Sequence, residues 1–261
     1  MIGFRQPPPR TRTLLLLGLA SGFLAATLGI GGGNVTVPAL ASFLGVPLKR
    51  AIGSSLVAIV FVAATAVLLE TATEPGNLLW VEAAVLALGS LAGAPCGAAI
   101  LRRIPDRPLV LLFCALLLLG AARMLGLLDF GARGDGGEIG GFLLLGAGFA
   151  AGLSASLFGI GGGIVVVPAL VVAAGAPFHA ARATSLAAIV PTTLAAAISH
   201  ARLRTIDGAL VRALLPGGIL GAAAGVLVVQ RLPAREMRAA FALFLLFVVA
   251  RLARSTVKSA R

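Results

Sequence analysis

Two glycine runs in this sequence could bind an anion with main-chain amides alone. The first glycine run covers residues 29–33 and the second covers residues 159–163, both with the letters GIGGG. Consecutive glycines destabilise a helix by about 1 kcal/mol each relative to alanine. Pro38 and Pro168 follow the two runs and suit the first turn of a new helix. Such a helix presents unpaired N–H groups and the positive end of its dipole, which together bind anions.

New half-helices are therefore expected to begin near Asn34 and Ile164, with both N-termini facing one central pocket. The alternative is that the glycines only allow close helix packing. Three adjacent glycines followed by a proline, present twice, favour a break that lines a cavity.

Hydroxyl groups recur after each glycine run. Ser54 and Ser55 follow the first run, and Thr184 and Ser185 follow the second. Their hydroxyls could donate hydrogen bonds to a substrate oxygen. The alternative is that each one bonds a carbonyl of its own helix.

Four charged or titratable residues are candidates for anion attraction or for coupling to protons: Arg182, His200, Glu70 and Glu82. The alternatives are an interface anchor for Arg182 and a helix cap for His200. No acidic residue falls in the middle of an apolar run, whereas cation pathways usually contain buried Asp or Glu. The pattern favours an anionic substrate.

Catalytic motifs are missing from the sequence. It contains no G-x-x-x-x-G-K-[ST], H-E-x-x-H or G-x-S-x-G motif, and its two histidines do not form a metal-ligand pattern. The glycine runs lack the G-x-G-x-x-G spacing of dinucleotide sites. We expect no catalytic residue, metal or cofactor, and the protein is not expected to be an enzyme.

The composition indicates a membrane protein that positions these residues on apolar helices. Of 261 residues, 59% are hydrophobic, 11% are charged and 34 are glycine. A soluble domain typically has about 25% charged residues. The net charge is +12, but the basic residues lie between long apolar runs, which favours loops flanking membrane spans over a nucleic-acid interface. Cys96 and Cys114 lie inside apolar runs, where cysteine behaves as a small apolar residue.

Six apolar runs are long enough to cross a bilayer, which needs about 20 helical residues. They are residues 51–69, 83–101, 108–128, 183–199, 213–230 and 237–254. Two longer stretches, 13–48 and 139–178, contain the glycine runs and are expected to be interrupted.

The chain contains one unit twice. A constant spacing of 130 residues takes Gly29 to Gly159 and Ser55 to Ser185, and a spacing of 128 takes Gly93 to Gly221. This duplication predicts five segments: a cytoplasmic N-terminal tail (1–12), a first repeat (13–128), a linker (129–138), a second repeat (139–254) and a cytoplasmic C-terminal tail (255–261).

The distribution of basic residues indicates how the repeats are oriented. If each interrupted stretch crosses once, the repeats are parallel and the two sides receive 9 and 10 basic residues. If each stretch enters and returns as a hairpin, the repeats are inverted and the sides receive 14 and 5. Because Lys and Arg favour the cytoplasmic side, inversion is preferred, with both termini inside. Inverted repeats with broken helices are typical of secondary transporters.

The doubled segment resembles the sulfite exporter TauE/SafE family of membrane permeases. Each copy has a GIGGG-x-x-x-VPAL-like sequence followed by A-x-x-[ST]-S-L, and the second adds Ser199-His200 and Arg202–Asp207. Thr205 stands where the family more often has glycine. The resemblance covers about residues 13–254 and implies a bacterial inner-membrane transporter of sulfur-containing anions. Its signature positions are Gly29, Gly31, Gly32, Gly33 and Pro38, and Gly159, Gly161, Gly162, Gly163 and Pro168.

The two copies differ just after the glycines. Asn34 and Thr36 of the first copy correspond to Ile164 and Val166 of the second. The pocket is therefore expected to be chemically asymmetric, with Asn34 and Thr36 as substrate contacts.

Together these patterns predict an all-α integral membrane protein of two inverted repeats, each with a re-entrant Gly-rich hairpin and three transmembrane helices. We expect a permease for sulfite or an organosulfonate in the inner membrane, with a small anion and the lipid bilayer as partners and no nucleic acid; homo-oligomerisation is left open. The alternatives are a passive anion channel and a non-transporting membrane subunit. The expected substrate-binding residues are Gly31, Gly32, Gly33, Asn34, Thr36, Ser54, Ser55, Gly161, Gly162, Gly163, Ile164, Thr184 and Ser185.

Overall fold

The described part of the chain is entirely helical. The computed structural model describes residues 11–42, 44–100, 118, 121–122, 125, 127 and 138–258. Within them lie nine α-helices, one short 3₁₀ helix and no strand, so the all-α prediction is confirmed there. The elements are α1 (Thr11–Leu28), α2 (Gly33–Ser42), α3 (Leu48–Thr73), η1 (Pro75–Asn77), α4 (Trp80–Ile100), α6 (Glu138–Phe158), α7 (Gly163–Ala173), α8 (Phe178–Arg202), α9 (Gly208–Val229) and α10 (Ala234–Lys258).

Within the described residues, six helices are long and apolar enough to cross a membrane: α1, α3, α4, α6, α8 and α9. Four of them contain the spans predicted at 51–69, 83–101, 183–199 and 213–230, apart from one residue at the end of two of these. The predicted span 108–128 lies almost wholly outside the described residues. The predicted span 237–254 lies within α10, which is not among the six candidates.

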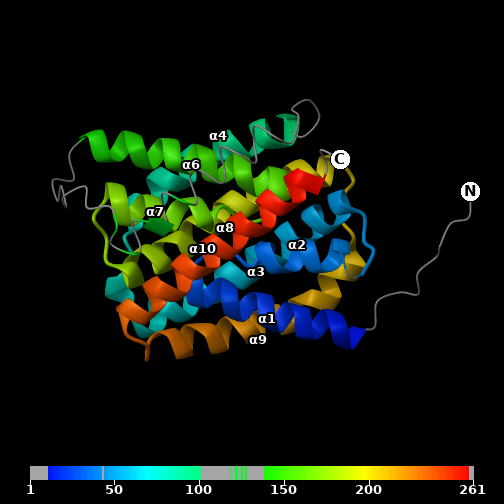
Figure 1. The fold of residues 1–261 in the computed structure, drawn as a ribbon, viewed down its shortest axis with the longest axis horizontal. Helices are drawn as coiled ribbons and strands as arrows, with labels where there is room; N and C mark the ends of the chain where they lie inside the picture. Colours follow the sequence, from blue (N-terminus) through cyan, green and yellow to red (C-terminus); the bar gives the residue numbers. More distant parts are fainter. Residues whose placement is uncertain are drawn as a thin grey trace, which may run out of the picture.

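The two halves of the chain contain matching elements. Helices α1, α2, α3 and α4 correspond to α6, α7, α8 and α9 at the spacings seen in the sequence. Helices α1 and α9 lie side by side along one edge, and α4 and α6 lie along the opposite edge (Figure 1). Each edge therefore joins a helix from one half to a helix from the other half.

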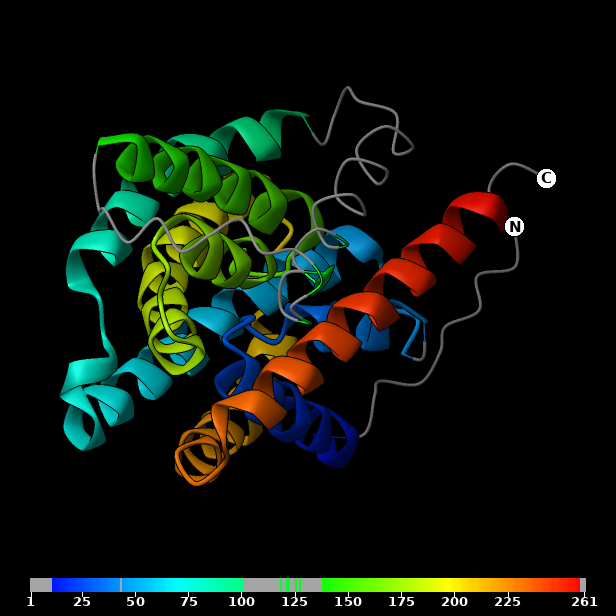
Figure 2. The same cartoon turned by 60° about the vertical axis from the view of Figure 1, so that its left-hand side comes forward.

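Helices α3 and α8 pack against each other between these edges and run antiparallel. Glu70 in the last turn of α3 contacts Arg182 near the start of α8. At the opposite end, Gly53 near the start of α3 lies against Thr205, just after α8. Helix α10 lies across the outside of this bundle (Figure 2), where its Phe241 ring packs 5.8 Å from the Phe178 ring of α8.

Glycines allow the edge helices to touch backbone to backbone. A Cβ atom on Gly22 of α1 would overlap the carbonyl oxygen of Gly218 in α9. The equivalent Gly152 of α6 has the same relation to Ser90 of α4. Small residues serve this purpose in membrane helices, where close van der Waals contact drives association.

We expect Gly22→Ala to lower the free energy of unfolding by about 1–3 kcal/mol, because overpacking a close contact forces the backbone to shift. Gly141→Ala is the matched control, since a Cβ on Gly141 of α6 would meet nothing within 4 Å. The control is expected to be neutral or stabilising by up to about 1 kcal/mol. Thermal unfolding of the purified protein in detergent, followed by size exclusion, measures both; equal midpoints would contradict the packing role.

Candidate functional site

Both glycine runs interrupt the helix, as predicted. Helix α1 ends at Leu28 and α2 begins at Gly33, and α6 and α7 are separated at the equivalent places. In the first run Gly29, Gly31 and Gly32 have φ angles of +70°, +81° and +76°. The equivalent glycines of the second run have +70°, +84° and +82°. These left-handed conformations are accessible to glycine at little cost, so the local sequence determines where the helices break.

The new helices begin one residue earlier than predicted, at Gly33 and Gly163. Pro38 and Pro168 consequently lie inside α2 and α7 rather than in the first turn, which corrects the sequence-based expectation. A proline inside a helix removes the bond to the carbonyl group four residues earlier, and its ring also crowds that carbonyl.

The two breaks contact each other in the interior of the protein. A Cβ on Gly31 would lie 3.4 Å from the Cα of Gly161, and a Cβ on Gly33 would overlap the carbonyl oxygen of Gly159. Ser55 donates a hydrogen bond to that oxygen at 3.2 Å. The equivalent Ser185 donates to the Gly29 oxygen at 2.8 Å. Each break is thus held by a hydroxyl from the opposite half of the chain.

Some main-chain N–H groups at the breaks have no hydrogen-bond partner among the described residues. The N–H groups of Val35 and Thr36 both bond the Gly32 carbonyl, whereas those of Gly31 and Gly32 make no hydrogen bond to any described residue. The second run repeats this arrangement around Gly162. Unpaired N–H groups at a helix N-terminus are the feature that accommodates anions.

A small cavity lies beside the first break. Its volume, counted as the space open to the centre of a water-sized sphere, is ≈ 10 Å³. This is room for about one water molecule. Its polar wall consists of Gly31 and Gly32 with the side chains of Ser21, Thr36 and Ser55, and its apolar wall comes from α1, α3 and α9.

The second break lacks the same polar wall. Ala151 and Val166 stand where the first half has Ser21 and Thr36. Ser90 and Thr192 stand where the cavity wall has Gly218 and Val62, and the Thr192 hydroxyl bonds the Ser90 hydroxyl at 2.7 Å. Both sides therefore carry hydroxyl groups, but at different positions: Ser21, Thr36 and Ser55 on the first side, and Ser185, Thr192 and Ser90 on the second.

The remaining predicted contacts lie near the breaks but outside the cavity wall. Asn34 has a buried Nδ2 atom with no hydrogen-bond partner, and Ile164 is packed in the apolar core. Ser54 accepts a hydrogen bond from the Asp207 N–H at 2.9 Å, and Thr184 accepts one from the Leu79 N–H at 3.0 Å. These two hydroxyls hold connecting segments of the opposite half.

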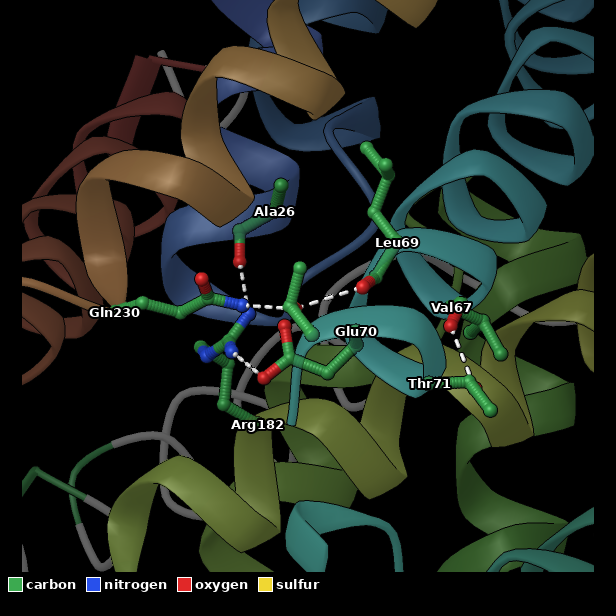
Figure 3. A network of polar contacts seen from close by, with 8 residues as sticks. Ala26, Val67, Leu69, Glu70, Thr71, Arg182 and Gln230 are labelled. Carbon is green, nitrogen blue, oxygen red and sulfur yellow. Dashed lines mark hydrogen bonds and ion pairs between the residues drawn. The ribbon is translucent and has the colours of Figure 1, made fainter. Parts of the chain in front are cut away.

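Two of the four charged or titratable candidates form a pair. Arg182 Nη2 lies 2.6 Å from Glu70 Oε1, and both side chains are 0% exposed (Figure 3). Arg182 Nη1 also donates to the Ala26 carbonyl at 2.8 Å, in the last turn of α1. The sequence nominated both residues without predicting that they pair.

The other two candidates lie apart from this pair. His200 is buried at the far end of α8, about 27 Å from Arg182 by helix rise. Its ring nitrogens contact the Ser156 carbonyl at 3.0 Å and the Thr205 hydroxyl at 2.9 Å. Glu82 is partly buried in the first turn of α4 and has no ion pair with a described residue.

Comparison with known proteins places the chain in one family. A family model described as "Sulfite exporter TauE/SafE" matches residues 2–124 and 144–261. The chain belongs to the sulfite exporter TauE/SafE family. With six apolar helices among its described residues, this TauE/SafE chain is a multi-pass membrane protein of a transporter family, which is not an enzyme class.

Curated relatives of the TauE/SafE chain carry transporter names. A "Probable membrane transporter protein" of Xylella fastidiosa (strain Temecula1) is 32% identical over 219 residues, covering 82% of this chain and 83% of the relative. The "Probable membrane transporter protein YunE" of Bacillus subtilis (strain 168) is 25% identical over 252 residues, covering 86% and 90%. No solved structure matches the chain.

Ser21 is a cavity residue of the TauE/SafE chain that sequence reasoning missed. It lies on α1, eight residues before the first glycine run, and its hydroxyl bonds the Gly18 carbonyl at 3.0 Å. Its replacement by Ala151 in the second half was visible in the sequence. The difference between the two copies was therefore the signal that could have identified it.

Proposed function

We propose that this protein is a secondary transporter that moves a small sulfur-containing anion, sulfite or an organosulfonate, across the bacterial inner membrane. One observation carries the proposal: unpaired glycine amides and three hydroxyl-bearing side chains surround a cavity between apolar helices. The amide donors match the oxygens of an anion and supply no negative charge for a cation. The hydroxyls of Ser21, Thr36 and Ser55 donate to the carbonyls of Gly18, Gly32 and Gly159 in this conformation, so each would have to turn to donate to an anion.

Inverted repeats form part of the proposal. Antiparallel α3 and α8 are equivalent helices, so two halves that both cross the membrane would point in opposite directions. Helices α1 and α9 run in the same direction, because Gly18 and Gly22 lie against Leu214 and Gly218 in that order. Helix α9 follows α8 and runs back across the bundle, in the direction of α3 and α1. Helices α1 and α3 can share a direction if α1 and α2 form a re-entrant hairpin that enters and leaves on one side. This arrangement agrees with both termini in the cytoplasm.

The described conformation is closed around the site. A cavity for one water molecule cannot hold sulfite, which has four non-hydrogen atoms, so the breaks must move apart during transport. Rocking of one half against the other around α3 and α8 would widen the cavity and expose it to alternate sides. A closed cavity supports a carrier over a continuously open channel.

Uptake of labelled sulfite, taurine and sulfate into proteoliposomes tests the proposal. A carrier is expected to show saturable uptake and counterflow of one of these anions. Linear flux without counterflow would indicate a channel, and no flux of any of the three would overturn the transport proposal.

We expect Thr36→Val to raise the KM for the transported anion at least about 10-fold, because a hydrogen bond to a charged group contributes about 1.5–3 kcal/mol. Val166→Thr, the mirror substitution in the second half, is the matched control and should leave uptake unchanged. Initial uptake rates against anion concentration measure both. Equal KM values for Thr36→Val and the wild type would remove Thr36 from the site.

A further inference from the structure

The ion pair between Glu70 and Arg182 lies wholly inside the protein. Both side chains are 0% exposed, on helices that qualify as membrane spans. Removing two charges from water costs more than an apolar pair of the same size, so burial of the pair is not explained by stability. Ionisable residues within membrane segments commonly mark substrate or proton pathways.

Glu70 bonds only one of the two N–H groups, Nε–H and Nη2–H, that lie on the same side of the Arg182 guanidinium. The Nε–H and Nη2–H groups of a guanidinium point in the same direction and match two oxygens of one oxyanion. Glu70 Oε1 bonds Nη2 alone, whereas Arg182 Nε and Glu70 Oε2 are buried without any hydrogen-bond partner (Figure 3). An anion that bonds both N–H groups would satisfy an edge that the carboxylate leaves incomplete.

Arg182 also lies against the first glycine run. A Cβ on Gly29 would lie 3.0 Å from the Arg182 Cγ atom, and Nη1 bonds the carbonyl of Ala26 just before the break. The cavity lies at Gly31 and Gly32 of the same run. The Arg182 side chain and the cavity therefore contact the same glycine run, with Ile30 between the two places.

The opposite half shows that this fold does not need a charge pair here. At the equivalent positions Ile52 replaces Arg182 and His200 replaces Glu70. His200 bonds the carbonyl of Ser156, which is the counterpart of Ala26, and both of its ring nitrogens have partners. At one end of the bundle every polar side-chain atom of His200 has a partner, whereas at the other end the Glu70–Arg182 pair leaves two polar atoms unpaired.

We propose that Arg182 is a second anion-binding site, at which the transported oxyanion displaces Glu70 and the displaced carboxylate takes up one proton from water. This inference rests on the proposed transport function and adds that anion transport is coupled to proton movement. Two oxygens of a sulfonate or sulfite accept the Nε–H and Nη2–H hydrogen bonds. For a monovalent anion the buried site stays neutral, since one anion replaces one carboxylate. One proton therefore moves with each anion.

Few other titratable groups surround the pair. His179 on α8 interacts electrostatically with both residues. Helix α1 contributes the Ala26 carbonyl, and Gln230 after α9 is uncharged and bonds Thr73 of α3. Glu74 caps α3 and is exposed. Glu70 is therefore the buried carboxylate through which proton uptake would act.

Binding of methanesulfonate to the purified full-length protein in detergent tests the site, because the single charge of this probe does not change between about pH 6 and about pH 8. We expect the wild type to bind about 10-fold more tightly for each unit that the pH falls, because Glu70 must be protonated. Glu70→Gln mimics the protonated acid, and it should bind at least about 10-fold more tightly than the wild type at the higher pH and lose the pH dependence. Adding Arg182→Lys to this variant should abolish the gain, since lysine lacks the two-donor edge.

Glu74→Gln is the matched control, because it removes an exposed carboxylate from the same end of α3, and it should behave as the wild type. Affinity of the wild type that does not change with pH would overturn the inference without any variant, as would tight binding by Glu70→Gln that survives Arg182→Lys. If the wild type transports an anion but Glu70→Gln binds methanesulfonate as the wild type does, the second site is rejected and the transport function is retained. If methanesulfonate binding depends on Arg182 but no anion is transported, the proposed transport function is rejected and the binding site is retained.

Discussion

Replacing Gly32 with alanine is expected to lower the rate of anion uptake at least about 100-fold, equivalent to about 2.7 kcal/mol of activation free energy. Gly32 has a φ of +76°, and a Cβ there would lie 2.8 Å from the Ser21 carbonyl oxygen. The left-handed conformation alone costs about 1–2 kcal/mol for a residue with a side chain. Because Gly32 also lines the cavity, the methyl group shifts the wall that has to receive the anion.

Gly175→Ala separates the clash from the backbone strain. Gly175 has a similar φ of +62°, but a Cβ there would meet nothing within 4 Å. This control should transport at close to the wild-type rate when equal amounts of folded protein are compared by proteoliposome uptake. If Gly32→Ala and Gly175→Ala transport equally, the first glycine run is not part of the transport site.

Replacing Arg182 with leucine is expected to lower the free energy of unfolding by about 3–5 kcal/mol, because it leaves the Glu70 carboxylate buried without its partner. Adding Glu70→Leu should restore most of the stability, since an apolar pair of similar volume is commonly as stable as a buried ion pair. Thermal unfolding in detergent measures both variants.

Arg212→Leu is the control for loss of one positive charge. Arg212 is exposed on α9, where its side chain bonds only the Gly208 carbonyl, so its loss should change stability by less than about 0.5 kcal/mol. A single Arg182→Leu variant as stable as this control would show that Glu70 is not held as a buried carboxylate.

Much of the fold could be predicted because its determinants are local. Hydropathy along short windows predicted α3, α4, α8 and α9 to within a few residues. The cost of consecutive glycines in a helix predicted the interruptions after Leu28 and Phe158. The first residue of each following helix was less predictable, because Gly33 and Gly163 can begin a helix as readily as the residues after them. The hairpin topology and the domain limits stay predictions.

Pairwise contacts were beyond the reach of these local rules. Ser55 and Ser185 were nominated for their hydroxyls, but their hydrogen bonds to Gly159 and Gly29 depend on how two distant segments cross. Glu70 and Arg182 are 112 residues apart in the sequence, and no spacing rule connects them.

The amino-acid sequence by itself determined that this is an apolar helical chain with two matched breaks, because hydropathy and backbone flexibility belong to each residue and its neighbours. Only the tertiary structure decided that the breaks touch, that a small cavity lies beside the first break, and that the half-paired Arg182 lies against Gly29 of the same glycine run. Those features depend on which surfaces of the two halves face each other, and the packing of small residues such as Gly22 against Gly218 sets that arrangement.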